Sequence, residues 1–240
     1  MRHILVNYRF CVIINALNNH FPALICEKLQ KGRRKMNPIT LHILSAACAY
    51  LIVGLNPAII LSKTIYKKDI RECGSGNPGF TNFKRSFGNQ WAWWVFVLDL
   101  TKAALVIASF AYLFHVHKMG YQYGAAYTGL FCMLGHILPV WYGLKGGKGF
   151  LVLFSLIWFI SWKAGVVATA AWTILFLCSK YMSLSTMGAM AAAFFYLLLA
   201  GVDSPAVLWL YGTEVLILIV RHHGNINRLL HGTEKKFSFK

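Results

Sequence analysis

The stretch GHILPVWYGLKGGKGF, residues 135–150, leaves an apolar, aromatic segment and ends in glycines flanked by lysines. Glycine lets the backbone approach a ligand closely, and successive unpaired N–H groups form a concave anion nest. We therefore predict a phosphate-binding loop; the alternative is a plain basic loop at a membrane surface. It is not a nucleotide P-loop, because Gly149 stands where a hydroxyl would hold magnesium. The candidate binding residues are Lys145, Gly146, Gly147, Lys148 and Gly149.

The composition outside this stretch is that of a membrane protein. The chain of 240 residues is 58% hydrophobic and only 13% charged, whereas charged residues make up about a quarter of a typical soluble domain. Lysine and arginine number 24 against 7 acidic residues. DNA-binding domains seldom carry membrane-length apolar runs, so we do not expect nucleic acid as a partner. The six cysteines form no C-x-x-C pair and predict neither a zinc site nor a disulfide frame.

Apolar segments follow one another from residue 39, each near or somewhat below the ~20 residues that cross a bilayer. We predict an all-α integral membrane protein with seven transmembrane helices. The alternative is six spans with one re-entrant or kinked segment, because the fourth and fifth segments are short. The predicted spans are 39–61, 91–114, 121–143, 149–162, 164–179, 184–201 and 205–220.

Positive charge predicts the orientation, because Lys and Arg are retained on the cytoplasmic side of a membrane. The loops after spans one, three and five and the C-terminal segment carry most basic residues after position 35, whereas the opposite loops hold only Lys118 and Lys163. We expect an outside N-terminus, a cytoplasmic C-terminus and cytoplasmic motif loops.

Residues 1–35 differ from the rest, since they are weakly apolar and end in a basic cluster rather than starting with one. A signal peptide has the opposite order. We expect the natural start to be Met36, with KGRRK at 31–35 a translated purine-rich ribosome-binding site, and residues 36–240 to form the functional domain.

The loop after span one contains GSGNPGFTNFKR, residues 74–85. Small hydroxyl and amide donors on a glycine-bent backbone can surround a phosphate, and an arginine adds a two-pronged contact. The alternative is an exposed turn that begins a short helix. The candidate residues are Ser75, Asn77, Thr81, Asn82 and Arg85.

The third polar stretch is RHHGNINRLLHGTE, residues 221–234. Helical periodicity groups Arg221, His222, Asn225 and Arg228 near one face, where they suit an anion and a hydroxyl; the alternative is a basic helix that anchors to lipid headgroups. Ser183, before span six, is either a donor to the same site or a helix cap.

Four further polar residues lie in the apolar segments. His136 is either a hydrogen-bonded interface residue or part of the site. Asp99 and Lys102 stand three positions apart in span two and are expected to pair, either for function or to fasten helices. Glu214 in span seven receives no role.

Together, GSGN-x-G-x-TN-x-x-R, GH-x-x-P followed by KGGKG, and RH-x-x-NI-x-RL-x-x-G-x-E resemble the bacterial membrane-integral acyl-phosphate:glycerol-3-phosphate acyltransferase family. The resemblance runs from about Leu44 to the C-terminus. It implies acyl transfer from acyl phosphate to the 1-hydroxyl of glycerol 3-phosphate in phospholipid biosynthesis, at the bacterial inner membrane. It implies no cofactor, metal or obligate protein partner.

The resemblance also implies roles for the candidate residues. Lys148, Arg85 and the glycine amides would hold the two phosphates, and Asn225 with His222 would orient the attacking hydroxyl. The implied catalytic residues are Lys148, Ser183, His222 and Asn225. The implied substrate-binding residues are Ser75, Asn77, Thr81, Asn82, Arg85, His136, Lys145, Gly146, Gly147, Gly149 and Arg228.

The chain departs from the family pattern at Pro78, Phe80, Phe150 and Gly224. Two other classes remain open: a transporter or channel for an organic anion, and a non-catalytic scaffold. We see no internal repeat of the kind many transporters show. Neither a hydrolase nucleophile elbow nor a zinc-protease motif is present.

Overall fold

The computed structural model describes residues 36–238, which contain helices and no strand. The predicted start at Met36 concerns residues 1–35, which lie outside this part. The helices are α3 (Pro38–Gly54), α4 (Pro57–Ile65), η1 (Ile70–Glu72), α5 (Phe80–Phe87), α6 (Asn89–Val116), α7 (Tyr121–Ile137), η2 (Val140–Tyr142), α8 (Phe150–Ile160), α9 (Trp162–Ser179), α10 (Met182–Ala200), α11 (Pro205–Arg221) and α12 (His223–Leu230).

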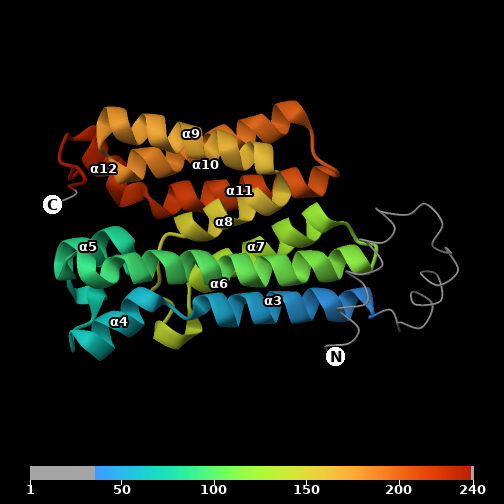
Figure 1. The fold of residues 1–240 in the computed structure, drawn as a ribbon, viewed down its shortest axis with the longest axis horizontal. Helices are drawn as coiled ribbons and strands as arrows, with labels where there is room; N and C mark the ends of the chain where they lie inside the picture. Colours follow the sequence, from blue (N-terminus) through green and yellow to red (C-terminus); the bar gives the residue numbers. More distant parts are fainter. Residues whose placement is uncertain (1–35, 239–240) are drawn as a thin grey trace, which may run out of the picture. The chain divides into compact units, whose positions relative to one another are not determined.

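The long helices from Pro38 onward pack into a bundle. Figure 1 shows α3, α6 and α7 side by side on one side and α9 and α10 on the other, with α8 and α11 between them. The short helices α4, α5 and α12 lie at one end of this bundle, and the α6–α7 and α10–α11 connections lie at the opposite end (Figure 1). All three polar stretches named above are therefore at the same end.

Large apolar side chains cover the outside of the bundle. Leu105, Leu199 and Trp209 are 69%, 87% and 78% exposed. Exposed apolar surface of this kind is stable against lipid tails, which do not penalise it as water does. The all-α membrane class predicted from composition is confirmed by this arrangement.

The predicted count of seven spans is not confirmed. Within residues 36–238, five helices are long and apolar enough to cross a membrane, or six if α11 and α12, bent by 57°, form one span. The fourth predicted span is α8, which has only 11 residues. At 1.5 Å per residue it reaches roughly half of the ~30 Å hydrocarbon core.

Polar residues and glycines set the helix boundaries. Within the first predicted span the helix is interrupted at Asn56, although Pro38–Ile65 still forms one candidate span. The Asn56 side chain accepts a hydrogen bond from Ile59 N and so caps α4, with Pro57 as the first residue of that helix. Ser161 is extended, ends α8 and caps α9 by accepting from Ala164 N. The predicted boundary between the fourth and fifth spans is thus a change of helix.

The first polar stretch is held by a small apolar core of its own. Ile59 of α4, Ile70 of η1 and Phe83 of α5 are fully buried together with Val95 of α6. Fastened in this way to the start of α6, the loop of residues 73–79 has a defined position at the end of the bundle.

Candidate functional site at one end of the bundle

The glycine loop of residues 143–149 packs against the C-terminal end of α7. Gly146 N donates to Ile137 O at 3.1 Å, and Gly147 N donates to His136 O at 3.0 Å. The prediction that these two N–H groups are free to bind an anion is therefore wrong. The last carbonyls of a helix have no intrahelical partner, and here they take the loop amides.

The glycines instead allow close approach. A Cβ at Gly146 would overlap the carbonyl oxygen of His136, and one at Gly147 would overlap the His136 imidazole. His136 thus lies behind the loop. The loop ends at Gly149, which has a left-handed backbone with φ 88° and precedes the first residue of α8.

Lys148 leaves the loop in the direction of α12, where its ammonium donates to Asn225 Oδ1. A second link joins Arg221 Nη2 to Gly147 O at 3.3 Å. The glycine loop and the third polar stretch, more than 70 positions apart in the sequence, are therefore in direct contact, as predicted.

Glu234 is the centre of the cluster. Its Oε1 accepts hydrogen bonds from Ser183 Oγ and Asn225 Nδ2, both at 2.7 Å, and its Oε2 accepts from Arg228 Nε at 2.7 Å. Three of the predicted site residues, from α10 and α12, thus converge on one carboxylate. We call Lys148, Ser183, Asn225, Arg228 and Glu234 the cationic cluster.

Sequence reasoning missed Glu234 as a site residue. The signal was a lone acid in a segment that holds Arg221, Arg228, Lys235 and Lys236. Arg221 was grouped with the third polar stretch but received no catalytic or binding role, although its Nε is buried and has no hydrogen-bond partner among the described residues.

Charges within the cluster shift one another's pKa. Burial and, to a smaller extent, the nearby positive charge of Arg228 lower the pKa of Lys148 to about 8, although Glu234 opposes the shift. For Glu234, burial favours a raised pKa, but hydrogen bonds from Asn225, Ser183 and Arg228 outweigh it and hold the pKa below its usual value. Glu234 is therefore an anion at neutral pH.

Arg85 brings the first polar stretch to the cluster. Its Nη2 donates to Lys235 O at 3.1 Å, next to Glu234. Burial lowers the pKa of Arg85, and the charges of Glu234 and Arg228 act on it in opposite directions. Three cationic side chains, Lys148, Arg85 and Arg228, one from each stretch, thus lie close enough to Glu234 to interact with its charge.

The Asn82 amide makes its hydrogen bonds within its own loop. Its Oδ1 accepts from Ser75 N at 2.9 Å, and its Nδ2 donates to Cys73 O at 2.9 Å. Ser75, Asn77 and Thr81 lie in or beside this loop, and no hydrogen bond among the described residues joins their side chains to the cationic cluster. Lys145 is exposed, and no hydrogen bond among the described residues joins its side chain to the cluster.

The two loops are tied to each other by Arg71. Its Nη1 donates to Tyr142 O at 2.7 Å, and its other guanidinium nitrogens bind the carboxylate of Asp69. The Arg71 hydrogen bonds hold the pKa of Asp69 well below its usual range. This charged pair fixes the spacing between the first loop and the segment that leads into the glycine loop.

His222 stands at the bend between α11 and α12, buried, with Nδ1 2.8 Å from Leu218 O. A carbonyl oxygen only accepts, so Nδ1 carries the proton and Nε2 of the neutral ring is an acceptor. The ring can therefore accept a hydrogen bond from a hydroxyl near Asn225.

Two positions that depart from the family pattern have clear surroundings. Phe80 packs against Trp93 and against Phe237 of the C-terminal segment, with ring centroids 5.1 and 6.3 Å apart. A Cβ at Gly224 would come within 3.7 Å of Arg228 Nη1, which is an ordinary contact.

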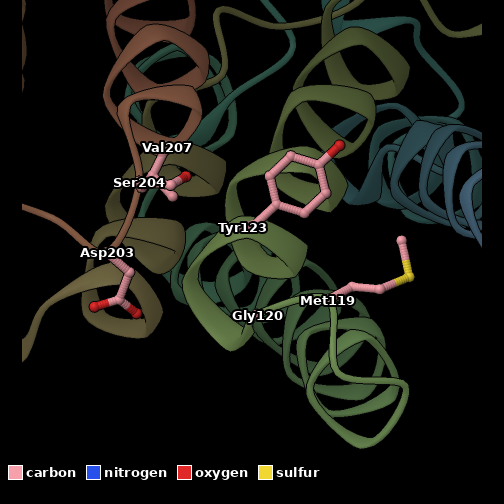
Figure 2. Close-up of a pocket in the computed structure, with 6 residues that line it drawn as sticks. All are labelled: Met119, Gly120, Tyr123, Asp203, Ser204 and Val207. Atoms are coloured by element: carbon pink, nitrogen blue, oxygen red, sulfur yellow. The ribbon is translucent and has the colours of Figure 1, made fainter.

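A separate pocket of about 410 Å³ lies at the other end of the bundle, where α7 and α11 begin (Figure 2). It contains no predicted site residue. Its lining residues are Met119, Gly120, Tyr123, Asp203, Ser204 and Val207. In the described part of the chain, no group of three or more His, Cys, Asp or Glu residues is placed to hold a metal ion.

The fold and site define an all-helical membrane protein with a cationic site at one end of its bundle. The family model described as glycerol-3-phosphate acyltransferase matches residues 43–232. A glycerol-3-phosphate acyltransferase of Finegoldia magna is 37% identical over 202 residues, which cover 84% of this chain and 98% of that protein. One of Aquifex aeolicus is 34% identical and covers 79% of this chain and 95% of its own length.

Solved structures agree with the sequence relatives. A crystal structure of PlsY (YgiH), an integral membrane glycerol 3-phosphate acyltransferase in its glycerol 3-phosphate form, superposes with a TM-score of 0.74 at 32% identity and covers 82% of this chain and 96% of its own. Its lysophosphatidic acid form gives a TM-score of 0.71 at 31% identity, with 82% and 95% covered. The chain belongs to the glycerol-3-phosphate acyltransferase family and is an integral membrane protein.

Proposed function

We propose that this protein transfers a fatty acyl group from acyl phosphate to the 1-hydroxyl of glycerol 3-phosphate. The products are 1-acyl-glycerol 3-phosphate and inorganic phosphate, an early step of phospholipid synthesis. Family membership supports an acyltransferase that acts on glycerol 3-phosphate, and the donor and the 1-position are the finer parts of the proposal.

The observation that carries the proposal is the convergence on Glu234. Donors from α10 and α12 hold two anionic oxygen atoms, and Lys148 stands beside them. A phosphate presents acceptors of the same kind. Lys148 uses one of its three donors for Asn225, and Arg221 Nε is buried without a partner within residues 36–238, so both have donors left for a phosphate.

The reaction needs no covalent nucleophile, because acyl phosphate is an activated mixed anhydride. The substrate hydroxyl attacks the acyl carbonyl carbon, the new ester bond forms, and the bond from that carbon to the phosphate oxygen breaks. The hydroxyl proton passes to the departing phosphate. Holding the two phosphates and orienting the hydroxyl supply the catalysis.

Different residues of the chain bind the phosphates and orient the hydroxyl. Lys148, Arg85 and Arg228 neutralise the phosphates, and Asn225 with the acceptor nitrogen of His222 orients the hydroxyl. Ser183 acts through Glu234, which sets the position of Asn225. The acyl chain lies along the apolar surface of the bundle. We place the site on the cytoplasmic face of the bacterial inner membrane, in line with the distribution of Lys and Arg.

The test is turnover by the purified protein in lipid nanodiscs with acyl phosphate and radiolabelled glycerol 3-phosphate. We expect labelled lysophosphatidic acid that carries the acyl group at position 1, and no product with acyl-coenzyme A as the donor. Product from acyl-coenzyme A alone would overturn the choice of donor. Absence of any product, when a family member makes it under the same conditions, would overturn the proposal.

A further inference from the structure

A charged pair is buried in the middle of α6, behind the glycine loop. Lys102 Nζ lies 2.8 Å from Asp99 Oδ1, as expected from their spacing, and the Asp99 side chain is 2% exposed. Charges inside a membrane-length helix are costly, and an apolar pair of similar size is often as stable or more stable. Fastening helices together therefore does not by itself account for this pair.

The acidic end of the pair faces His136. Nδ1 of His136 is 3.7 Å from Asp99 Oδ1, the oxygen that Lys102 contacts, and this Nδ1 makes no hydrogen bond to another described residue. The opposite edge of the imidazole, at Nε2, lies against Gly147, and the His136 carbonyl accepts from Gly147 N at 3.0 Å. One histidine thus connects Asp99 to the residue that precedes Lys148.

The basic end of the pair reaches the other loop. Lys102 Nζ also donates to Leu55 O at 2.7 Å, where α3 ends. The next residue, Asn56, donates through Nδ2 to Pro78 O at 3.0 Å in the first polar stretch. The pair accordingly contacts the supports of both loops, the one that carries Lys148 and the one that leads to Arg85.

We infer that Asp99 and Lys102 are positioning residues for the acyl transfer. They touch no substrate. Asp99 holds the His136 ring against Gly147, and Lys102 holds the α3–α4 junction against the first loop. This sets the distance between Lys148 and Arg85, so that both reach the substrate phosphates. The test of this inference by KM rests on the proposed function, whereas the test by hydrogen exchange does not.

The decisive variant is Asp99→Leu combined with Lys102→Met, which removes both charges and keeps the volume. If the pair only fastened helices, the apolar replacement would fasten them equally well, and both the melting temperature and the KM would stay at their wild-type values. Positioning predicts that the melting temperature stays while the KM for glycerol 3-phosphate rises about 10- to 100-fold. A stable variant with an unchanged KM would overturn the inference.

The matched control is Glu214→Gln in α11, which changes a fully buried acid whose carboxylate oxygens have no partner among the described residues. It is expected to leave the KM at the wild-type value. An equal rise in KM in this control would show that any change to a buried polar side chain in the bundle has the same effect, and would overturn the inference.

A second measurement does not depend on turnover. Hydrogen exchange of residues 144–149 reports the bonds from Gly146 and Gly147 to the end of α7. We expect exchange about fivefold faster in the double variant and in Asp99→Asn, which is the variant to use if the double one does not fold. Exchange at the wild-type rate in both would overturn the inference, even for a protein that makes no lysophosphatidic acid.

Discussion

At the scale of single residues, we expect the ammonium of Lys148 to control the dependence of activity on pH. Burial lowers its pKa to about 8, so it is charged below that pH and neutral above it. Only the charged form neutralises a phosphate. We expect kcat/KM for glycerol 3-phosphate to fall about tenfold per pH unit above this value, since that ratio reports ionisations of the free enzyme.

Lys148→Arg provides the control for this pH profile. An arginine stays protonated at every pH that the protein tolerates, so the alkaline decline is expected to disappear. The overall rate will be lower, because a planar guanidinium does not place its donors where an ammonium does. An alkaline decline that is the same in Lys148→Arg would assign the ionisation to another group.

Glu234 is the residue on which the donors of the cluster depend. Glu234→Gln keeps one oxygen acceptor but turns an N–H group toward Arg228 or toward Asn225 and Ser183. We expect the free energy of unfolding to fall by about 1–3 kcal/mol, the usual cost of leaving a buried polar group unpaired. Thermal unfolding in detergent and the KM for glycerol 3-phosphate measure the two effects.

Lys235→Ala is the matched control. It removes the adjacent basic side chain but keeps the carbonyl that accepts from Arg85. It is expected to unfold at the wild-type temperature with an unchanged KM. If the control and Glu234→Gln were equally damaged, the effect would come from the C-terminal segment as a whole and not from the carboxylate.

At the scale of elements, the glycine loop is built by its contact with the end of α7. In Gly147→Ala the new methyl group overlaps the His136 imidazole, so the loop or the ring has to move. We expect the KM for glycerol 3-phosphate to rise about 10- to 100-fold while the acyl phosphate KM changes less. Initial rates at varied concentrations of each substrate measure this difference.

Gly224→Ala tests the same glycine-to-alanine substitution at a position where the added methyl group has space. Its nearest neighbour is Arg228 Nη1 at 3.7 Å, and its backbone is helical. We expect α12 to gain about 0.5–1 kcal/mol, because alanine loses less conformational freedom than glycine on folding. A rise in KM equal to that of Gly147→Ala would show that any added methyl group near the site is harmful.

Hydropathy predicted helices such as α6, α7 and α10 closely, because a long apolar run in a membrane has few alternatives to a helix. The break at Asn56 was missed although Asn-Pro is a helix start signal, since the apolar residues on both sides read as continuous. The shortness of α8 was expected from the sequence, and the structure adds its local cause, the extended backbone at Ser161.

The sequence likewise predicted some features of the site and not others. The meeting of Lys148, Ser183, Asn225 and Arg228 was expected from the motifs, and the structure brings these residues together. The bonded amides of Gly146 and Gly147 were not expected, because whether a loop N–H is free depends on which helix end packs against it. The position of Glu234 depends on the path of the C-terminal segment, which local pattern does not specify.

At the scale of the whole molecule, the clustering of basic residues at one end predicts how the protein lies in the membrane. In a cysteine-free background, Lys118→Cys in the α6–α7 connection is expected to react with a membrane-impermeant maleimide in intact spheroplasts. Lys67→Cys, which is exposed beyond α4, is expected to react only after lysis. The opposite pattern would place the site on the outer face.

The C-terminal segment crosses the site and is fastened on both sides of it. Phe237 N donates to Lys180 O at 2.8 Å, Ser238 O accepts from Lys84 at 2.7 Å, and Glu234 lies between these anchors and α12. A C-terminal purification tag would follow Ser238, one of these anchors, by only two residues, so a load that displaced this segment would also displace the carboxylate that organises the donors. Recombinant protein for kinetic work is therefore best made with its affinity handle elsewhere in the chain, or with one removed by a protease before assay.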